Sequence, residues 1–148
     1  CETEGDAAAS ALLERADQAL YRAKHDGRNR VRIAAAQAYI DALVSHQADA
    51  VPFTPDCIRI EMGLKTGRSG DHLRRSLNRG PQFKLIEKTT TPEFSVDGDN
   101  IRAKFDVLTK PRLFGWRVCS HVDETFLIPA SDGKIHHIRA SLSPFLSR

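Results

Sequence analysis

A histidine and an aspartate two residues apart form the clearest candidate for acid–base chemistry in this sequence. His121 and Asp123 lie in a stretch whose residues alternate as in a β-strand, so both side chains should point to the same face of a sheet. An imidazole beside a carboxylate can take up and return a proton near neutral pH. The same pair could instead form a hydrogen bond at a subunit contact, and the sequence leaves both interpretations open.

The other potential ligands do not have the spacing of a metal site. His136 and His137 are adjacent in a predicted strand, so they should point to opposite faces. The three cysteines, Cys1, Cys57 and Cys119, are far apart and form no CxxC pair, which favours free thiols in a reducing compartment. Because no group of His, Cys and acidic residues has metal-ligand spacing, we expect neither a metal nor another cofactor.

The composition is typical of one globular domain with at most a short appendage. The chain has 148 residues, of which 41% are hydrophobic and 28% charged. No apolar run approaches the roughly 20 residues of a membrane helix, and the chain does not start with a basic segment followed by an apolar one. We therefore expect a cytoplasmic protein without a membrane partner. The first residue is cysteine, not methionine, which suggests a piece of a longer or processed product.

The charge distribution gives little reason to expect a nucleic-acid partner. The net charge of +3 is small. A local basic cluster lies near a predicted short helix, but no aromatic residues are interleaved with it for base stacking. We interpret the cluster as a solvated helix face. It consists of Arg68, Arg74, Arg75, Arg79 and Lys84.

Three segments have the pattern of helices. Residues 7–25 are rich in alanine and place apolar residues near helical spacing, and Asp26-Gly27 is a typical helix end. Residues 31–33 could then form a short strand. A second helix is predicted from about residue 36 to about residue 46, and a third begins at Ser69-Gly70 and is closed by Gly80-Pro81.

The rest of the chain alternates as β-strands do. Glycine-containing segments at 97–100 and 131–134 predict hairpin turns, since glycine supplies the positive φ that tight turns need. Pro52 and Pro55 are expected to break the chain ahead of the first strand. Helices followed by an antiparallel meander predict an α+β fold, with helices packed on one face of a curved sheet. The predicted strands are residues 57–62, 90–96, 101–108, 118–128 and 135–142.

Two of these strands differ in the composition of their faces. Residues 101–108 have one apolar face and one charged face that should contact water. Residues 118–128 have no plainly solvated face, which is typical of a sheet with a pocket on one side and a subunit partner on the other. The apolar face of the first of these strands consists of Ile101, Ala103, Phe105 and Val107.

The stretch from Leu13 to Val31, LERADQALYRAKHDGRNRV, resembles the closing helix and strand of a GGDEF diguanylate cyclase domain. In that family, the residues at the positions of Lys24 and Arg28 contact nucleotide phosphates. The resemblance covers only the last quarter of such a domain and lacks its metal-binding loop. It therefore implies a leftover or upstream helical tail, residues 1–35, without nucleotide chemistry.

Residues 36–147 resemble a SnoaL-like domain of the nuclear transport factor 2-like, or ketosteroid isomerase-like, superfamily. The resemblance implies a cone-shaped antiparallel sheet wrapped on helices, with an apolar pocket at its open end, in a domain of residues 36–148. It also implies a homodimer and, with the GGDEF resemblance, a bacterial protein. The matching segments are Tyr39–Val44, Pro55–Cys57, Gly70–Leu73 and Asp132–Ile135.

The same resemblance implies roles for three residues. Tyr39, Glu61 and Asp123 fall where ketosteroid isomerase keeps its oxyanion-donating tyrosine, its carboxylate base and its protonated acid. Such a base removes a proton next to a carbonyl, and two donors hold the resulting oxyanion. Alternatively, Tyr39 is a core aromatic, Glu61 a surface charge and Asp123 the partner of a nearby arginine.

The expected function is therefore the binding of a small apolar molecule. Isomerase, cyclase or dehydratase chemistry on a carbonyl substrate, without a cofactor, is the catalytic version of this hypothesis. The alternative is a non-catalytic binding or dimerisation module attached to a diguanylate cyclase-type signalling protein. The resemblance and the strand pattern predict a pocket lined by Phe53, His72, Phe83, Phe105, Val107, Trp116, Thr125, Ile138 and Leu142.

Overall fold

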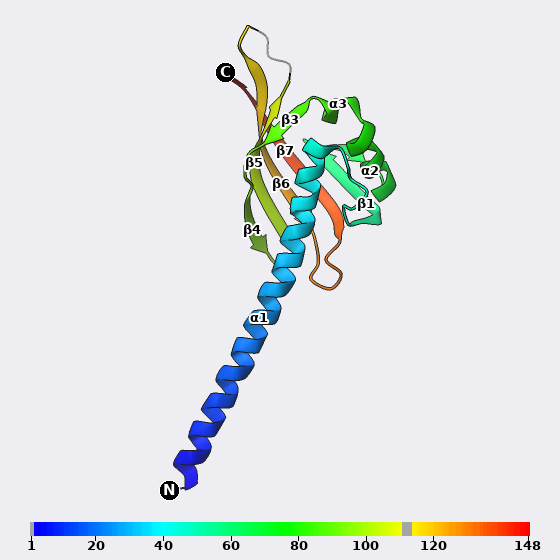
Figure 1. Ribbon diagram of the computed structural model, residues 1–148. Helices are drawn as coiled ribbons and strands as arrows, with labels where there is room; N and C mark the ends of the chain where they lie inside the picture. The colour runs from blue at the N-terminus through cyan, green and yellow to red at the C-terminus, as the bar shows by residue number, and fades with distance from the viewer. Residues whose placement is uncertain (1, 111–113) are drawn as a thin grey trace.

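The computed structural model describes residues 2–110 and 114–148, with side chains from residue 7 onward. It consists of a long helix, α1, and a curved sheet that wraps around the C-terminal part of this helix (Figure 1). Two short helices, α2 and α3, lie beside the sheet near the same end of α1. The predicted α+β architecture, with helices on one face of a curved sheet, is confirmed.

Ten elements follow one another in the described part of the chain. They are α1 (Glu2–Ser45), β1 (Phe53–Glu61), β2 (Leu64–Gly67), α2 (Gly70–Arg79), α3 (Pro81–Lys84), β3 (Ile86–Thr89), β4 (Glu93–Asp97), β5 (Asn100–Thr109), β6 (Arg117–Leu127) and β7 (Ile135–Ser147). The sheet order is β2-β1-β7-β6-β5-β3, and β4 pairs with β5. All pairs are antiparallel except β1 with β7.

α1 is longer than predicted, because it continues from Glu2 to Ser45. The predicted end at Asp26-Gly27 and the predicted strand at residues 31–33 were wrong. A glycine inside a helix costs only about 1 kcal/mol, and contacts with the sheet favour the helical conformation here. The buried Arg32 donates from Nε to the carbonyl oxygen of Ile128 at 2.6 Å.

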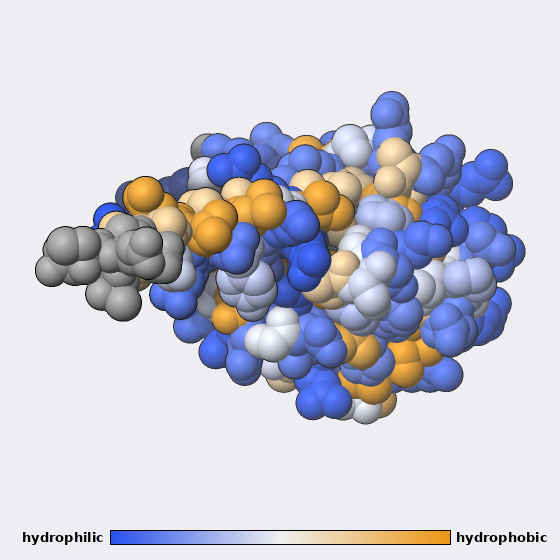
Figure 2. Space-filling view, turned by 90° about the horizontal axis from the view of Figure 1, so that it is seen from below, coloured by the Kyte–Doolittle hydropathy of each residue, from blue (hydrophilic) through white to orange (hydrophobic). Residues whose placement is uncertain are grey.

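The N-terminal half of α1 projects from the sheet, and its apolar residues are visible along it in Figure 2. Leu12, Leu13, Leu20 and Tyr21 are all exposed. α1 also crosses the boundary predicted at residue 35, although the division into a tail of residues 1–35 and a domain of residues 36–148 stays a prediction. Among the described residues, no helix has the length and apolar character needed to cross a bilayer.

The core lies between the inner face of the sheet and the C-terminal turns of α1. Tyr39 and Ile40 are fully buried there, as the predicted helical face requires. α2 closes one side, and its predicted start is confirmed, since Ser69 Oγ accepts a hydrogen bond from the amide of His72 at 3.1 Å. Gly70 follows directly, and a Cβ there would lie 2.4 Å from the carbonyl oxygen of Thr54.

The predicted strands at 101–108, 118–128 and 135–142 are confirmed as β5, β6 and β7. The predicted strand at 90–96 was too long, because the sheet pairing there begins at Glu93, and β2 and β3 were not predicted. Pro55 lies within β1 and does not precede it. It is tolerated because the pairing of β1 with β7 is irregular between Phe53 and Ile58.

Candidate functional site

A cavity of about 300 Å³ lies between the inner face of the sheet, the end of α1, and helices α2 and α3. Its wall is mainly apolar, with a few polar groups on one side, as is typical of small-molecule sites. The residues that line it are Leu43, Arg59, Glu61, Thr66, Leu73, Ser76, Gln82, Phe83, Ile86, Val107, Thr109, Ser120, Val122, Glu124 and Leu142.

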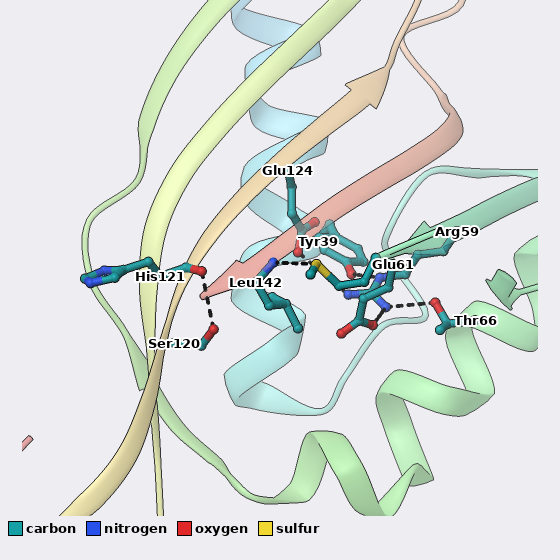
Figure 3. Close-up of polar contacts among 9 residues, drawn as sticks. Tyr39, Arg59, Glu61, Thr66, Ser120, His121, Glu124 and Leu142 are labelled. Carbon is teal, nitrogen blue, oxygen red and sulfur yellow. Dashed lines mark hydrogen bonds and ion pairs between the residues drawn. The ribbon is translucent and has the colours of Figure 1, made fainter. Parts of the chain in front are cut away.

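Arg59 lies at the centre of the polar side of this cavity (Figure 3). Its Nε donates to the hydroxyl of Tyr39 at 2.9 Å, and its Nη1 donates to Thr66 Oγ1 at 2.9 Å and to a carboxylate oxygen of Glu61. Its Nη2 lies 3.9 Å from Glu124 Oε1. One guanidinium, itself buried, therefore connects two carboxylates and a phenol.

Strand register explains why the two carboxylates meet. Arg59 and Glu61 are two residues apart on β1, so both point inward. Glu61 pairs with Ala140 of β7, and Ala140 pairs with Glu124 of β6. The two glutamates thus belong to one row across three strands, with Cα atoms about 10 Å apart. The Arg59 guanidinium contacts both of them.

Glu124 is the most perturbed acid of the site. The residue is buried, with 1% of its surface exposed, and among the described residues its Oε2 has no hydrogen-bond partner. Burial raises the pKa of Glu124 to about 7; Arg59 opposes this rise and Glu61 adds to it. Near neutral pH Glu124 can therefore carry a proton and donate it into the cavity.

Tyr39 supports Arg59 and does not line the cavity. It is fully buried and packs edge-on against Phe53 and Phe126. Burial raises the pKa of its phenol, more than the neighbouring guanidinium lowers it, so the hydroxyl keeps its proton. The phenol oxygen accepts the hydrogen bond that holds Arg59 in place. The predicted tyrosine thus belongs to the same cluster as Glu61, but one layer behind the cavity wall.

Asp123 and His121 lie on the opposite face of β6 from Glu124, and Figure 3 shows the His121 ring pointing away from the cluster. Asp123 accepts a hydrogen bond from Arg102 Nε at 2.9 Å, and His121 Nδ1 lies 2.6 Å from an oxygen of Asp106. The predicted convergence of Tyr39, Glu61 and Asp123, and a His121–Asp123 pair in the pocket, were therefore wrong. Strand alternation turns Asp123 outward and Glu124 inward.

Of the residues predicted to line a pocket, Phe83, Val107 and Leu142 line this cavity. The other predicted residues do not line it. Phe53, Phe105 and Ile138 are buried in the core, and His72 lies in the first turn of α2. Thr125 is on the outer face of the sheet, and the ring of Trp116 is 4.7 Å from the Arg148 guanidinium.

Arg59, Thr66 and Glu124 were not predicted as site residues. A signal for Glu124 existed, since it shares a face of β6 with Val122 and Phe126, whose apolar character marks the inner side. Arg59 gave no such signal, because an arginine in a strand usually faces water. Among the described side chains, those of residues 7–110 and 114–148, there is no cluster of three or more His, Cys, Asp or Glu that could hold a metal ion.

Several solved structures share this fold. An LEH-like epoxide hydrolase of M. tuberculosis has 18% identity and a TM-score of 0.61, over 77% of this chain and 84% of that chain. An epoxide hydrolase/cyclase-like enzyme, SalBIII, described with pyran ring formation in the polyether salinomycin, has 15% identity and a TM-score of 0.60, over 78% and 92%. An NTF-2 like protein of unknown function from Burkholderia xenovorans LB400 has 16% identity and a TM-score of 0.59, over 82% and 90%.

At these identities the similarity shows the fold alone, and the fold is NTF2-like, as the SnoaL resemblance implied. None of the curated proteins matches the sequence. The comparisons give no support to the GGDEF resemblance of residues 13–31. Residues 25–142 match the family described as Domain of unknown function (DUF8021). This match covers well over half of the chain, and the chain therefore belongs to that family.

Proposed function

We propose that this chain binds a small apolar molecule in the cavity and catalyses cofactor-free acid–base chemistry on it. The observation that carries the proposal is the pair of carboxylates, Glu61 and Glu124, that face each other across Ala140 with one guanidinium between them. A base and an acid held at one apolar cavity can move two protons in a single reaction. An NTF2-like fold, which is a ligand-binding fold, is consistent with this proposal.

The two glutamates have different environments and therefore different roles. Glu61 is partly exposed and ion-paired with Arg59, so it is the base. Glu124 is buried, and its Oε2 is free to donate when protonated, so it is the acid. Thr66 and Tyr39 orient the guanidinium. The acid role that the resemblance implied for Asp123 is thus assigned to its neighbour.

We infer that the substrate class is an epoxide. In epoxide opening, Glu61 takes a proton from a water or substrate hydroxyl whose oxygen attacks a ring carbon. The ring C–O bond breaks, and Glu124 gives its proton to the leaving oxygen. Carbonyl isomerisation fits less well, because it needs two donors at one oxygen and Asp123 lies outside. Two similar folds are described as epoxide hydrolase or epoxide hydrolase/cyclase-like, which agrees with this choice.

The test compares Glu61→Gln and Glu124→Gln with Asp123→Asn, which removes a carboxylate from the outer face of the same strand. The probe is styrene oxide, with diol formation followed by chromatography. We expect each glutamate variant to lose a factor of about 100 or more in kcat/KM, while Asp123→Asn keeps the wild-type value. If Glu124→Gln retains full activity, or if wild-type protein binds epoxides without opening them, the catalytic proposal is wrong and the chain is a binding module.

A further inference from the structure

The inner face of the sheet continues beyond the cavity as a strip of uncovered apolar residues. Val122 and Leu142, which line the cavity, are a cross-strand pair of β6 and β7. The pair Ser120–Pro144 lies two residues beyond Val122–Leu142 on the same face, and the pair Val118–Leu146 lies four residues beyond it. Side chains of one parity lie on one face of a sheet. We call Val118, Pro144 and Leu146 the apolar strip.

The strip is open to solvent. Val118 is 54% exposed and Leu146 65% exposed, whereas Val122 on the same face is buried. Figure 1 shows why: the last parts of β5 and β7 and the first part of β6 extend beyond α1 and α3. A paired aliphatic surface on the concave face, next to a ligand cavity, has the character of a binding surface.

The strip is continuous with the cavity. Thr109 and Ser120 belong to the cavity wall, and Thr109 Oγ1 donates a hydrogen bond to the carbonyl oxygen of Val118. The strip therefore begins where the wall ends. The cavity volume of about 300 Å³ is at the lower end of the range for ligand sites. A molecule larger than the cavity would extend over Val118 and Leu146.

We propose that the apolar strip binds the aliphatic tail of an elongated substrate whose reacting end occupies the cavity. This inference rests on the proposed function only for the identity of the reacting end, the epoxide. It narrows the substrate class to an epoxide at the end of a long apolar chain. Burial of tail methylenes against Val118 and Leu146 provides the affinity that a short epoxide lacks.

The experiment measures binding of terminal 1,2-epoxyalkanes of about six to about twelve carbons, by calorimetry and by tryptophan fluorescence, to the Glu61→Gln/Glu124→Gln protein, so that turnover does not interfere. Trp116 is the only tryptophan of the chain, and it shares the face of the strip. Beyond the length that fills the cavity, we expect each methylene to raise affinity about fourfold, the equivalent of roughly 0.8 kcal/mol, with a blue shift of the emission.

The same series is measured with Val118→Asp and Leu146→Asp in this background, and with Ser143→Asp as a control. Ser143 is an exposed β7 residue that points to the outer face. We expect the gain with chain length to disappear in the first two variants and to persist in the control. A gain that is absent in the parent protein, or equal in all variants, overturns the proposal.

Two further outcomes are distinguishable. If Val118→Asp changes the sedimentation coefficient and leaves the chain-length series unchanged, the strip contacts a second copy and not a ligand, and the inference is wrong. If wild-type protein opens no epoxide but the parent shows the length-dependent affinity, the catalytic proposal fails while the strip stands. If wild-type protein opens short epoxides but the parent protein binds longer ones no more tightly, the catalytic proposal stands and the proposal for the apolar strip is wrong.

Discussion

Replacing Glu124 with glutamine should stabilise the fold above neutral pH and change it little near pH 4.5. Burial raises the pKa of Glu124 from its ordinary value of 4.5 to about 7. Between these values the folded protein binds a proton that the unfolded chain has released, so the free energy of unfolding falls as pH rises. Each pKa unit corresponds to about 1.4 kcal/mol, which gives a loss of about 3 kcal/mol by pH 8. Glutamine resembles the protonated acid and avoids this loss.

The assay is urea unfolding of wild type and Glu124→Gln between about pH 4.5 and pH 8. The stability difference between the two proteins isolates this one carboxyl, because His72, His137 and the other titrating groups are present in both. We expect the difference to grow with pH and to level off above pH 7. Asp123→Asn, on the solvent side of β6, should show no such growth. If the stability difference between wild type and Glu124→Gln does not change with pH, the reasoning that Glu124 is buried and neutral at low pH is refuted.

Three further substitutions test the packing and the long helix that position the site. Tyr39→Phe removes the acceptor of the 2.9 Å bond from Arg59 Nε and should cost about 1–3 kcal/mol in urea unfolding, whereas Tyr21→Phe on the exposed part of α1 should cost nothing measurable. Gly70→Ala places a methyl group 2.4 Å from a backbone oxygen and should cost about 1–3 kcal/mol. Gly27→Ala meets no atom within 4 Å and should stabilise α1 by up to about 1 kcal/mol; destabilisation there would contradict a continuous helix.

The parts of the fold that local chemistry decides were predictable from the sequence. Ser69 caps α2 as expected, and the alternation of residues 101–108 identifies the buried face of β5. The continuity of α1 was not predictable, because a glycine directly after the last helical turn is a common helix end. Here the decisive contacts, such as Arg32 with Ile128, join residues far apart in the chain. Local patterns carry no record of such contacts.

The site was predictable only in part for a similar reason. Asp123 and Glu124 are adjacent in one strand, so their side chains point to opposite faces of the sheet. The choice between them depends on which face is the inner one. The apolar neighbours Val122 and Phe126 indicated the inner face, but the resemblance favoured Asp123. Arg59 could not be identified alone, because a buried guanidinium is stable only when carboxylates reach it, and one of the two here, Glu124, lies on another strand. Those partners are known only once the register of β1, β7 and β6 is known.

Charge balance in the cavity argues for chemistry over stability as the reason for this cluster. Arg59 brings one positive charge, and Glu61 alone neutralises it. Glu124 adds a second carboxylate at 3.9 Å, with one oxygen unpartnered and almost no contact with water. Such a group weakens a fold at neutral pH, and an apolar residue of similar volume would serve packing better. A domain with a solely structural role would gain no stability from Glu124. A domain that protonates a bound molecule needs a buried acid that can carry a proton near neutral pH.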